Sequence, residues 1–469
     1  MKTLRFLAIF LMLPFIQAEA SDRCSDEVFL RRAYLTTTGA LPKSNEAVKF
    51  LDNTKPNKRE ALINHLLNSE LYLRYMQMHW GDILRIKSEF PSNLWPNGVQ
   101  AYNRWLYEHL MNNTPYDQMV RELLICQGSN FRSPAVNFYR GFQQRTPENF
   151  YKNINLLFLG NRNCTDNGYV CFSQVRFKST KEWKEEIIYI DYNETPWQDI
   201  VLSDGTKLEV AANSDWREDY VSWLTSRENR RFAEVMVNRM WYWVFGKGIV
   251  NEPDDWREDN EPSDPELLKE LTDYFVNSNF NMKGLMKKIL MSDKFNSKMA
   301  PEGEYESHRL PAEVIVDALA SVTGVWNTYS SRVPEPFTFY PPRTRSTHLG
   351  DATVSSTELE LFGKVSRDVS LESQRNNSIT ARQLLYLMNS SELEQRIRKS
   401  PNLKIIMNKT PDTKELADAI TLLTLSRRAT GDEIELYRNY METNSLSLEE
   451  LAYDIMWMQL NCNEFLYNH

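Results

Sequence analysis

Apolar side chains recur at three- and four-residue intervals along most of the chain, which is the spacing of a helix with one buried face. The pattern is clear between Leu62 and Leu67 and again between Leu267 and Phe275. Only 16 of the 469 residues are glycine, a small share that favours helices over a turn-rich β fold. The sequence therefore predicts a mainly α-helical protein.

Strand-like runs interrupt the helical pattern between residues 166 and 212. β-branched and aromatic residues typical of strands gather there, in Val170–Phe172, Val175–Phe177, Ile187–Ile190 and Ile200–Leu202. The turn sequence Ser203–Thr206 follows and indicates a hairpin. We therefore expect two helical domains, residues 21–165 and 213–469, with a small β insertion at residues 166–212 between them.

The first residues have the layout of a secretory signal peptide. Two basic residues precede an apolar run from Phe6 to Ile16, and the triplet ending at Ala20 is a small-x-small cleavage sequence. The apolar run is too short to cross a membrane, and no later segment is longer. We expect a signal peptide over residues 1–20, cleaved after Ala20, a periplasmic or secreted location, and no membrane span.

The charge and the cysteine content exclude several classes of protein. The formal net charge is −8, which disfavours nucleic acid and anionic membranes as partners because both require a basic face. Five cysteines in so long a chain rule out a disulfide-rich miniprotein, and the odd number leaves at least one free thiol.

Two parts of the chain carry runs of residues that belong together in one family. The first part contains FLRRAYLTTTGALP at residues 29–42 and HWGD at residues 79–82. The second contains VNRMWYWVFGKGIV at residues 237–250 and ends with NEFLYNH at residues 463–469. Together they resemble secreted planctomycete cytochrome-associated proteins, in which a PSCyt-type domain of unknown function precedes a PSD-type domain of unknown function.

The resemblance implies an exported accessory or binding protein that serves a redox or polysaccharide-processing system. Its implied partners are other exported or surface proteins, or a polysaccharide. Members of this family often carry a Cys-x-x-Cys-His haem-attachment motif after a Leu-Gly pair. Here Asn161 stands at the first cysteine, Cys164 at the second and Thr165 at the histidine. We therefore expect no covalent haem and no other cofactor, which disfavours an electron-carrying haem protein.

Cys164 and Cys171 lie seven positions apart in this same stretch. In an exported protein they could form a disulfide, which would stabilise the fold by roughly 2–3 kcal/mol in the chain-entropy model. Two unpaired thiols are the alternative. A metal site is disfavoured because no histidine lies nearby. We predict the disulfide and no metal.

The loop at residues 251–261 is rich in carboxylates around Trp256. It could bind Ca²⁺ through oxygen ligands, although it lacks the EF-hand spacing. Alternatively, Asp254, Asp255 and Glu258 could be the catalytic carboxylates of a glycan-acting hydrolase, with Trp256 as a platform for the sugar. The simpler interpretation is a solvated acidic loop whose Trp256 packs into the core.

The most distinctive predicted helix contains Arg239 and Trp241. An arginine among tryptophans suits cation–π packing or a buried bond to an acid such as Asp254 or Asp255. We expect this bond to hold the acidic loop against the helix; ligand binding by Arg239, Trp241 and Trp256 is the alternative. His79, which precedes a Trp, is expected to be structural. No nucleophile elbow, phosphate loop or zinc-protease motif occurs, so whether the chain is an enzyme stays open.

Overall fold

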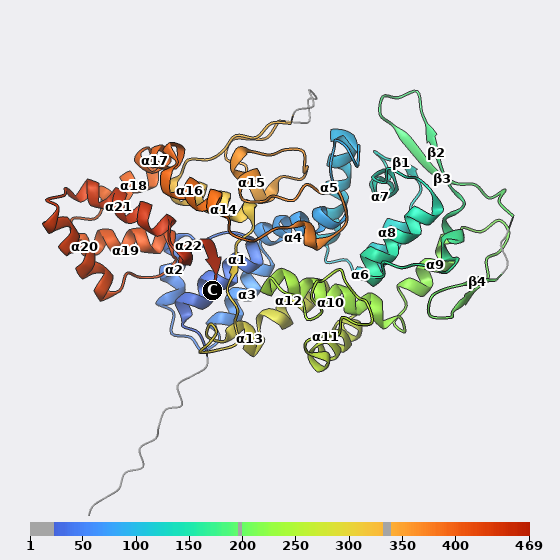
Figure 1. Cartoon of the computed structure of the whole chain (residues 1–469), viewed down its shortest axis with the longest axis horizontal. Helices are drawn as coiled ribbons and strands as arrows, with labels where there is room; N and C mark the ends of the chain where they lie inside the picture. Colours follow the sequence, from blue (N-terminus) through green and yellow to red (C-terminus); the bar gives the residue numbers. More distant parts are fainter. Residues whose placement is uncertain (1–22, 196–198, 332–338) are drawn as a thin grey trace, which may run out of the picture.

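The computed structural model describes residues 23–195, 199–331 and 339–469. Helices predominate, as predicted. The molecule is elongated in Figure 1, with the small sheets at one end and the helices of the C-terminal region at the other. The predicted signal peptide, residues 1–20, lies outside the described residues.

The N-terminal region is built of helices whose ends follow local rules. The Ser25 hydroxyl accepts a hydrogen bond from the Val28 amide at the start of the first helix, and Gly39 ends it at φ 59°. The helices are α1 (Asp26–Thr38), α2 (Ser44–Leu51), α3 (Lys58–Leu67), α4 (Glu70–Ile83), α5 (Trp95–Met111), α6 (Tyr116–Ile125), α7 (Asn137–Arg140) and α8 (Pro147–Leu159), with the 3-10 turn η1 (Pro134–Val136).

The predicted β segment forms two small antiparallel sheets. One has the strand order β1-β3-β2, and the other is the predicted hairpin of β4 and β5. The strands are β1 (Gly128–Ser129), β2 (Val175–Ser179), β3 (Glu186–Ile190), β4 (Ile200–Val201) and β5 (Lys207–Leu208). Strand β1 comes from outside the predicted insertion, so the first sheet also involves the chain after α6.

One strand prediction was wrong. Residues Val170–Phe172 lie in the 3-10 helix η2 (Gly168–Phe172) and not in a strand. All three side chains are buried, whereas successive residues of a strand point to opposite faces of a sheet. A short turn packed against α8 buries all three at once, and this outweighs their β propensity.

The C-terminal region is also helical. Its helices are α9 (Arg217–Leu224), α10 (Arg230–Phe245), α11 (Pro265–Asn277), α12 (Met282–Leu290), α13 (Asp293–Asn296), α14 (Ala312–Thr323), α15 (Thr357–Leu361), α16 (Ala381–Asn389), α17 (Ser391–Arg398), α18 (Pro401–Met407), α19 (Thr413–Thr424), α20 (Gly431–Thr443), α21 (Leu448–Leu460) and α22 (Asn463–Leu466). Two 3-10 turns, η4 (Ser346–His348) and η5 (Glu372–Gln374), lie between α14 and α16. Strand β6 (His308–Arg309) pairs with β7 (Tyr467–Asn468) near the end of the chain.

The N-terminal and C-terminal helices share one apolar core, which extends from Cys24 to Leu466. Helix α1 lies directly against the end of the chain (Figure 1). The buried Arg31 guanidinium donates to the Thr424 carbonyl at 3.1 Å and to the Phe465 carbonyl at 3.0 Å. These contacts satisfy carbonyls at the ends of two distant helices, so α1 and the C-terminal helices are packed as one body.

A buried ion-pair network also joins the N-terminal region to the C-terminal region. Asp82 at the end of α4 contacts Arg367 at 2.9 Å and Arg375 at 2.6 Å, and Arg375 also contacts Glu313 at 2.7 Å. All four side chains are buried. Burial alone would raise the pKa of Asp82, but Arg375 and Arg367 together hold that pKa below its usual value. The network therefore ties α4 to the segment that follows α15.

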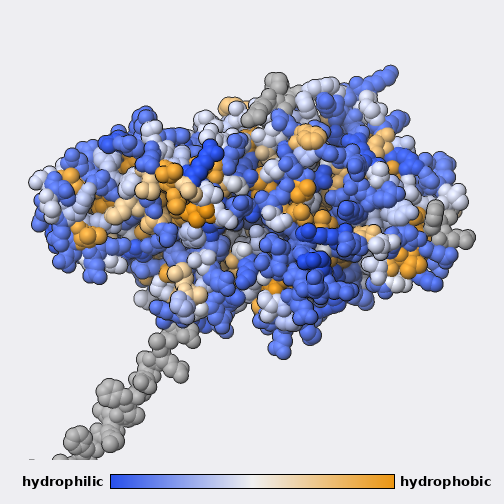
Figure 2. Space-filling model, in the orientation of Figure 1, coloured by the Kyte–Doolittle hydropathy of each residue, from blue (hydrophilic) through white to orange (hydrophobic). Residues whose placement is uncertain are grey.

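The surface is largely hydrophilic in Figure 2, with a group of hydrophobic side chains near α16. The exposed apolar residues there include Leu384, Leu385 and Met388. Within the part of the chain that the structure describes, no helix combines the length and the apolar character needed to cross a membrane.

Replacing Asp82 with Asn is expected to lower the free energy of unfolding by about 3–5 kcal/mol, because Arg367 would stay buried without a carboxylate and Arg375 would keep only Glu313. Denaturant titration of the purified chain measures this change. The control is Glu394→Gln, which removes an exposed pair with Arg398 and should cost at most about 1 kcal/mol. Equal losses in the two variants would contradict a structural role for the buried network.

Candidate functional site

Helix α10 carries Arg239 and Trp241, two of the residues that the sequence singled out. It begins at Arg230 and ends at Phe245, where Gly246 with a φ of 68° caps it. Arg239 faces the interior of the protein, while Trp241 lies on the floor of an open groove. The candidate functional site is therefore the region around the C-terminal half of this helix.

On the inner side of α10, Arg239 is held between the carboxyl groups of Asp254 and Glu372. Its Nη2 lies 3.7 Å from Asp254 Oδ1, and its Nε lies 3.5 Å from Glu372 Oε1. The same guanidinium donates to the Leu157 carbonyl at 3.0 Å. The ion pair expected between the helix and the acidic loop is thus present, with Asp254 as the acid.

Asp254 is anchored from a second direction. Its Oδ2 accepts hydrogen bonds from the backbone amides of Glu372 at 2.7 Å and Ser373 at 3.3 Å. Burial raises the pKa of Asp254, and Arg239 and these amides lower it only in part. With 1% of its surface exposed, Asp254 is enclosed by protein and fixes the loop in place.

The other two candidate carboxylates do not converge with Asp254. Asp255 contacts Arg257 in the same loop at 2.9 Å, and Glu258 is exposed on the surface. None of the three lines the groove described below. The structure therefore does not bring Asp254, Asp255 and Glu258 together around a sugar-sized cleft.

Trp256 packs inward, as the simpler interpretation of the loop predicted. Its indole Nε1 donates to the Pro253 carbonyl at 3.0 Å, and the Arg231 guanidinium lies 4.7 Å from the ring centroid. The ring lies directly on Gly160, at the end of α8. The acidic loop therefore covers the end of α8, where residues 161–165 begin.

The predicted disulfide is not formed in the structure, in which Cys164 and Cys171 are both free thiols. Cys171 is fully buried within η2, whereas Cys164 is half-buried in the preceding loop, with its sulfur 4.0 Å from the Asn161 carbonyl. The η2 turn directs the Cys171 side chain into the core, where it packs as a small apolar group. Burial raises the pKa of Cys164 to about 11 and that of Cys171 to about 12.

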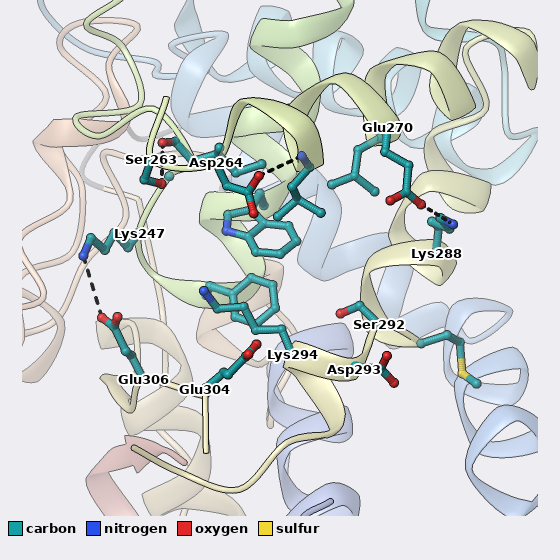
Figure 3. A pocket seen from close by; sticks show the side chains of 17 residues that line it. Lys247, Ser263, Asp264, Glu270, Lys288, Ser292, Asp293, Lys294, Glu304 and Glu306 are labelled. Carbon is teal, nitrogen blue, oxygen red and sulfur yellow. Dashed lines mark hydrogen bonds and ion pairs between the residues drawn. The ribbon is translucent and has the colours of Figure 1, made fainter. Parts of the chain in front are cut away.

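On the outer side of α10 an open groove of about 900 Å³ lies between α10, α11, α12 and the segment after α13. Its floor is apolar and includes Trp241, Phe245, Leu267 and Leu271. Its rim is charged, as Figure 3 shows. The rim residues are Lys247, Asp264, Glu270, Lys288, Asp293, Lys294, Glu304 and Glu306.

Some of the rim charges are paired. Lys288 contacts Glu270 at 2.8 Å, and the exposed Lys247 and Glu306 lie 3.9 Å apart. The Lys294 ammonium lies 5.7 Å from the centroid of Trp241, over the aromatic floor. Carboxylates outnumber lysines on this rim, so the groove has an acidic, hydrogen-bonding edge above an apolar base.

Two family models match the chain. Residues 14–163 match PSCyt2, a protein of unknown function (DUF1549), and residues 216–441 match PSD1, a protein of unknown function (DUF1553). Each of these two regions of the chain is therefore similar to one of the families. Their order confirms the resemblance predicted from the sequence, although neither description names a reaction. No curated protein and no solved structure matches the chain.

In this PSCyt2–PSD1 chain the groove lies entirely within the PSD1 match, and sequence reasoning did not find it. Trp241 and Phe245 are four residues apart on one helix, and this spacing predicts that the two aromatic rings share one face of the helix. The rim residues Asp293, Lys294 and Glu304 come from α13 and the loop after it, where no motif marks them. In the described ranges, 23–195, 199–331 and 339–469, no cluster of three or more His, Cys, Asp or Glu side chains is arranged to hold a metal.

Replacing Gly160 with Ala is expected to destabilise this PSCyt2–PSD1 chain more than replacing Gly205 with Ala. Both glycines have positive φ, 65° and 84°, but a Cβ at Gly160 would lie 2.1 Å from the Trp256 ring whereas one at Gly205 meets nothing within 4 Å. In each variant the free energy of unfolding should fall by about 1–2 kcal/mol because alanine disfavours the left-handed backbone. In Gly160→Ala it should fall by about 1–3 kcal/mol more because the new Cβ collides with the Trp256 ring. Thermal or denaturant unfolding measures the difference, and equal losses would show that Trp256 does not rest on Gly160.

Titration with a thiol reagent tests the state of the cysteines. Because Cys164 and Cys171 are protonated and partly or fully buried, we expect both to react slowly in the native chain. Five thiols should be counted after unfolding without reductant. A count of three, with Cys164 and Cys171 joined in a peptide map, would establish the disulfide instead.

Proposed function

We propose that the chain is an exported binding or accessory protein that holds its ligand in the groove beside α10. The groove itself carries this proposal: an apolar floor with Trp241 and Phe245 lies under a polar rim, and the volume is about 900 Å³. Ligand sites are typically concave, largely apolar and furnished with a few polar groups that fix orientation. A polysaccharide segment or part of another exported protein is the proposed occupant, and the proposed location is periplasmic or secreted.

Binding is favoured over glycan hydrolysis. Hydrolysis of a glycosidic bond requires two carboxyl groups that face the same sugar from opposite sides. In the acidic loop, Asp254 is engaged by Arg239 and two backbone amides, while Asp255 is paired with Arg257. A hydrolase that uses loop 251–261 therefore has weaker support than a binding protein that uses the groove.

The proposed protein carries no covalent haem of its own. Thioether attachment requires cysteines, and axial ligation in this motif requires the histidine that follows them. Asn161 and Thr165 supply neither group. A redox system served by this chain would hold its haem in a partner protein, and the chain would contribute recognition.

A glycan array and a pull-down with the mature chain test the proposed function. We expect retention of a glycan or of an exported protein, and a loss of about tenfold or more in affinity, about 1.4 kcal/mol, when Asp293→Asn and Glu304→Gln are combined. Both side chains lie on the groove rim and are exposed, so the fold should tolerate the change. The matched control is Glu435→Gln, an exposed carboxylate on α20.

Two outcomes would contradict the proposal. Unchanged binding by the rim variant would place the ligand elsewhere. Release of sugar from a glycan, abolished by Asp255→Asn or Glu258→Gln, would establish the hydrolase. A c-type haem band in the purified chain would separately contradict the absence of covalent haem.

A further inference from the structure

A second and much smaller cavity lies on the inner side of the end of α10, away from the groove. Its volume is about 30 Å³, and a cavity needs roughly 10–15 Å³ of this kind to hold one water molecule. It therefore has room for about two. The polar residues of its wall that matter here are His79, His308, Glu372, Arg375, Asn377 and Asn468.

The wall of this cavity contains buried polar atoms without partners. His79 Nε2, Arg375 Nε and Asn468 Oδ1 form no hydrogen bond to any described residue, and their side chains are 4%, 7% and 1% exposed. His308 Nδ1 and Asn377 Oδ1, on the same wall, are also unpartnered. Buried polar atoms in native proteins nearly always have a partner, and five of them around one cavity point to an occupant that supplies it.

The ion pairs closest to Glu372 and Arg375 balance one another, and the guanidinium of Arg32 also acts on His308. Arg239 faces Asp254, and Arg367 and Arg375 face Asp82 and Glu313, so three arginines oppose three carboxylates. Burial lowers the pKa of His79 to about 3 and that of His308 to about 4, so both imidazoles are uncharged near neutral pH. A charged occupant would add a buried charge without a counter-ion, which is strongly unfavourable.

Glu372 is the one group on this wall that titrates near neutral pH. Its Oε1 accepts a hydrogen bond from Trp243 Nε1 at 2.9 Å, and Arg239 approaches it from α10 at 3.5 Å. Burial raises the pKa of Glu372 to about 8; Arg239 lowers it, whereas Asp254 in the acidic loop and Asp82 in α4 raise it. Near neutral pH most of this side chain is therefore a neutral carboxylic acid that can donate a proton.

We propose that this cavity is a proton-exchange site in which Glu372 exchanges its proton with a bound water molecule. The site takes an uncharged molecule of one or two non-hydrogen atoms that both donates and accepts hydrogen bonds, and water is its resident occupant. In the exchange, the O–H bond of the Glu372 carboxylic acid breaks as a new O–H bond forms on the bound water. At the same time the bound water gives up one of its own O–H protons to solvent water, so the occupant of the cavity stays uncharged and the ionised Glu372 remains beside Arg239. The reverse transfer restores the acid, so the step requires no reactant besides water.

Infrared spectroscopy of the full chain, transferred from H₂O to D₂O, tests the proposal. The wild type should show the carbonyl band of a protonated carboxylic acid at pH 6, and the band should vanish as the pH rises through about 8. Glu372→Gln should lack the band, whereas the control Glu435→Gln should retain it. In D₂O the band should shift far faster than the chain unfolds globally, because a bound water would carry the exchange without global unfolding.

Asn377→Leu provides a further variant, of similar volume, that removes an unpartnered acceptor from the cavity wall. Exchange of the Glu372 proton should slow in this variant while the fold is retained. Three results would overturn the proposal: a band that persists in Glu372→Gln, exchange only at the rate of global unfolding, or the wild-type exchange rate in Asn377→Leu.

Stability against pH supplies a readout that does not depend on the spectrum. The pKa of Glu372 rises from its usual 4.5 to about 8 on folding, so the protonated acid favours the folded state and this stability is lost as the pH rises through that window. The free energy of unfolding of the wild type should therefore fall relative to that of Glu372→Gln between pH 4.5 and 8. A constant difference over this range would show that Glu372 does not titrate there.

Discussion

The contact of Asp82 with Arg367 and Arg375 fixes the part of the chain on which the candidate site depends. Both arginines belong to the irregular segment between α15 and α16, and this segment has little regular structure of its own to hold it. Two buried ion pairs to one carboxylate at the end of α4 give it a defined position. Because Arg375 also contacts Glu313 in α14, this segment of the PSD1 match is joined both to α4 in the PSCyt2 match and to α14 in its own match.

That segment in turn positions the acidic loop. Its Glu372 amide donates to Asp254, and its Glu372 carboxylate lies beside Arg239. The loop, the segment and α10 therefore meet at one buried cluster. Helix periodicity then separates two environments on α10: Arg239 and Trp243, four residues apart, face the cluster, while Trp241 and Phe245, also four apart, form the groove floor. One rigid helix thus divides the large outer groove from the small inner cavity.

Local rules explain why much of the fold could be predicted. The Ser447 capping box at the start of α21 and the Asp264 cap of α11 are short-range hydrogen bonds that a sequence displays directly. The contact of Arg239 with Asp254 was also predictable, because a buried arginine needs an acid and the acidic loop follows its helix closely. Val170–Phe172 could not be assigned correctly from composition, since burial of all three side chains under α8 decides its conformation.

The long-range pairs were beyond prediction. Asp82 and Arg375 are 293 residues apart, and nothing in the residues around either one indicates the other. Glu372 has an ordinary neighbourhood in the sequence, Leu371 and Ser373, and its raised pKa comes entirely from burial among distant groups. The groove rim and the small cavity depend on the same tertiary packing, so a single sequence shows their residue types without showing that they meet.

Gly160 and the residues that follow it differ in how strongly the structure constrains them. Gly160 is constrained by its positive φ and by the Trp256 ring, so the end of α8 is tied to the acidic loop. Thr165 is exposed and Asn161 half-buried, beyond the end of that helix, and replacements at such positions rarely change stability much. Substitutions within residues 161–165 are therefore expected to leave α10, the groove and the inner cavity in place, because no residue of this segment lines either space.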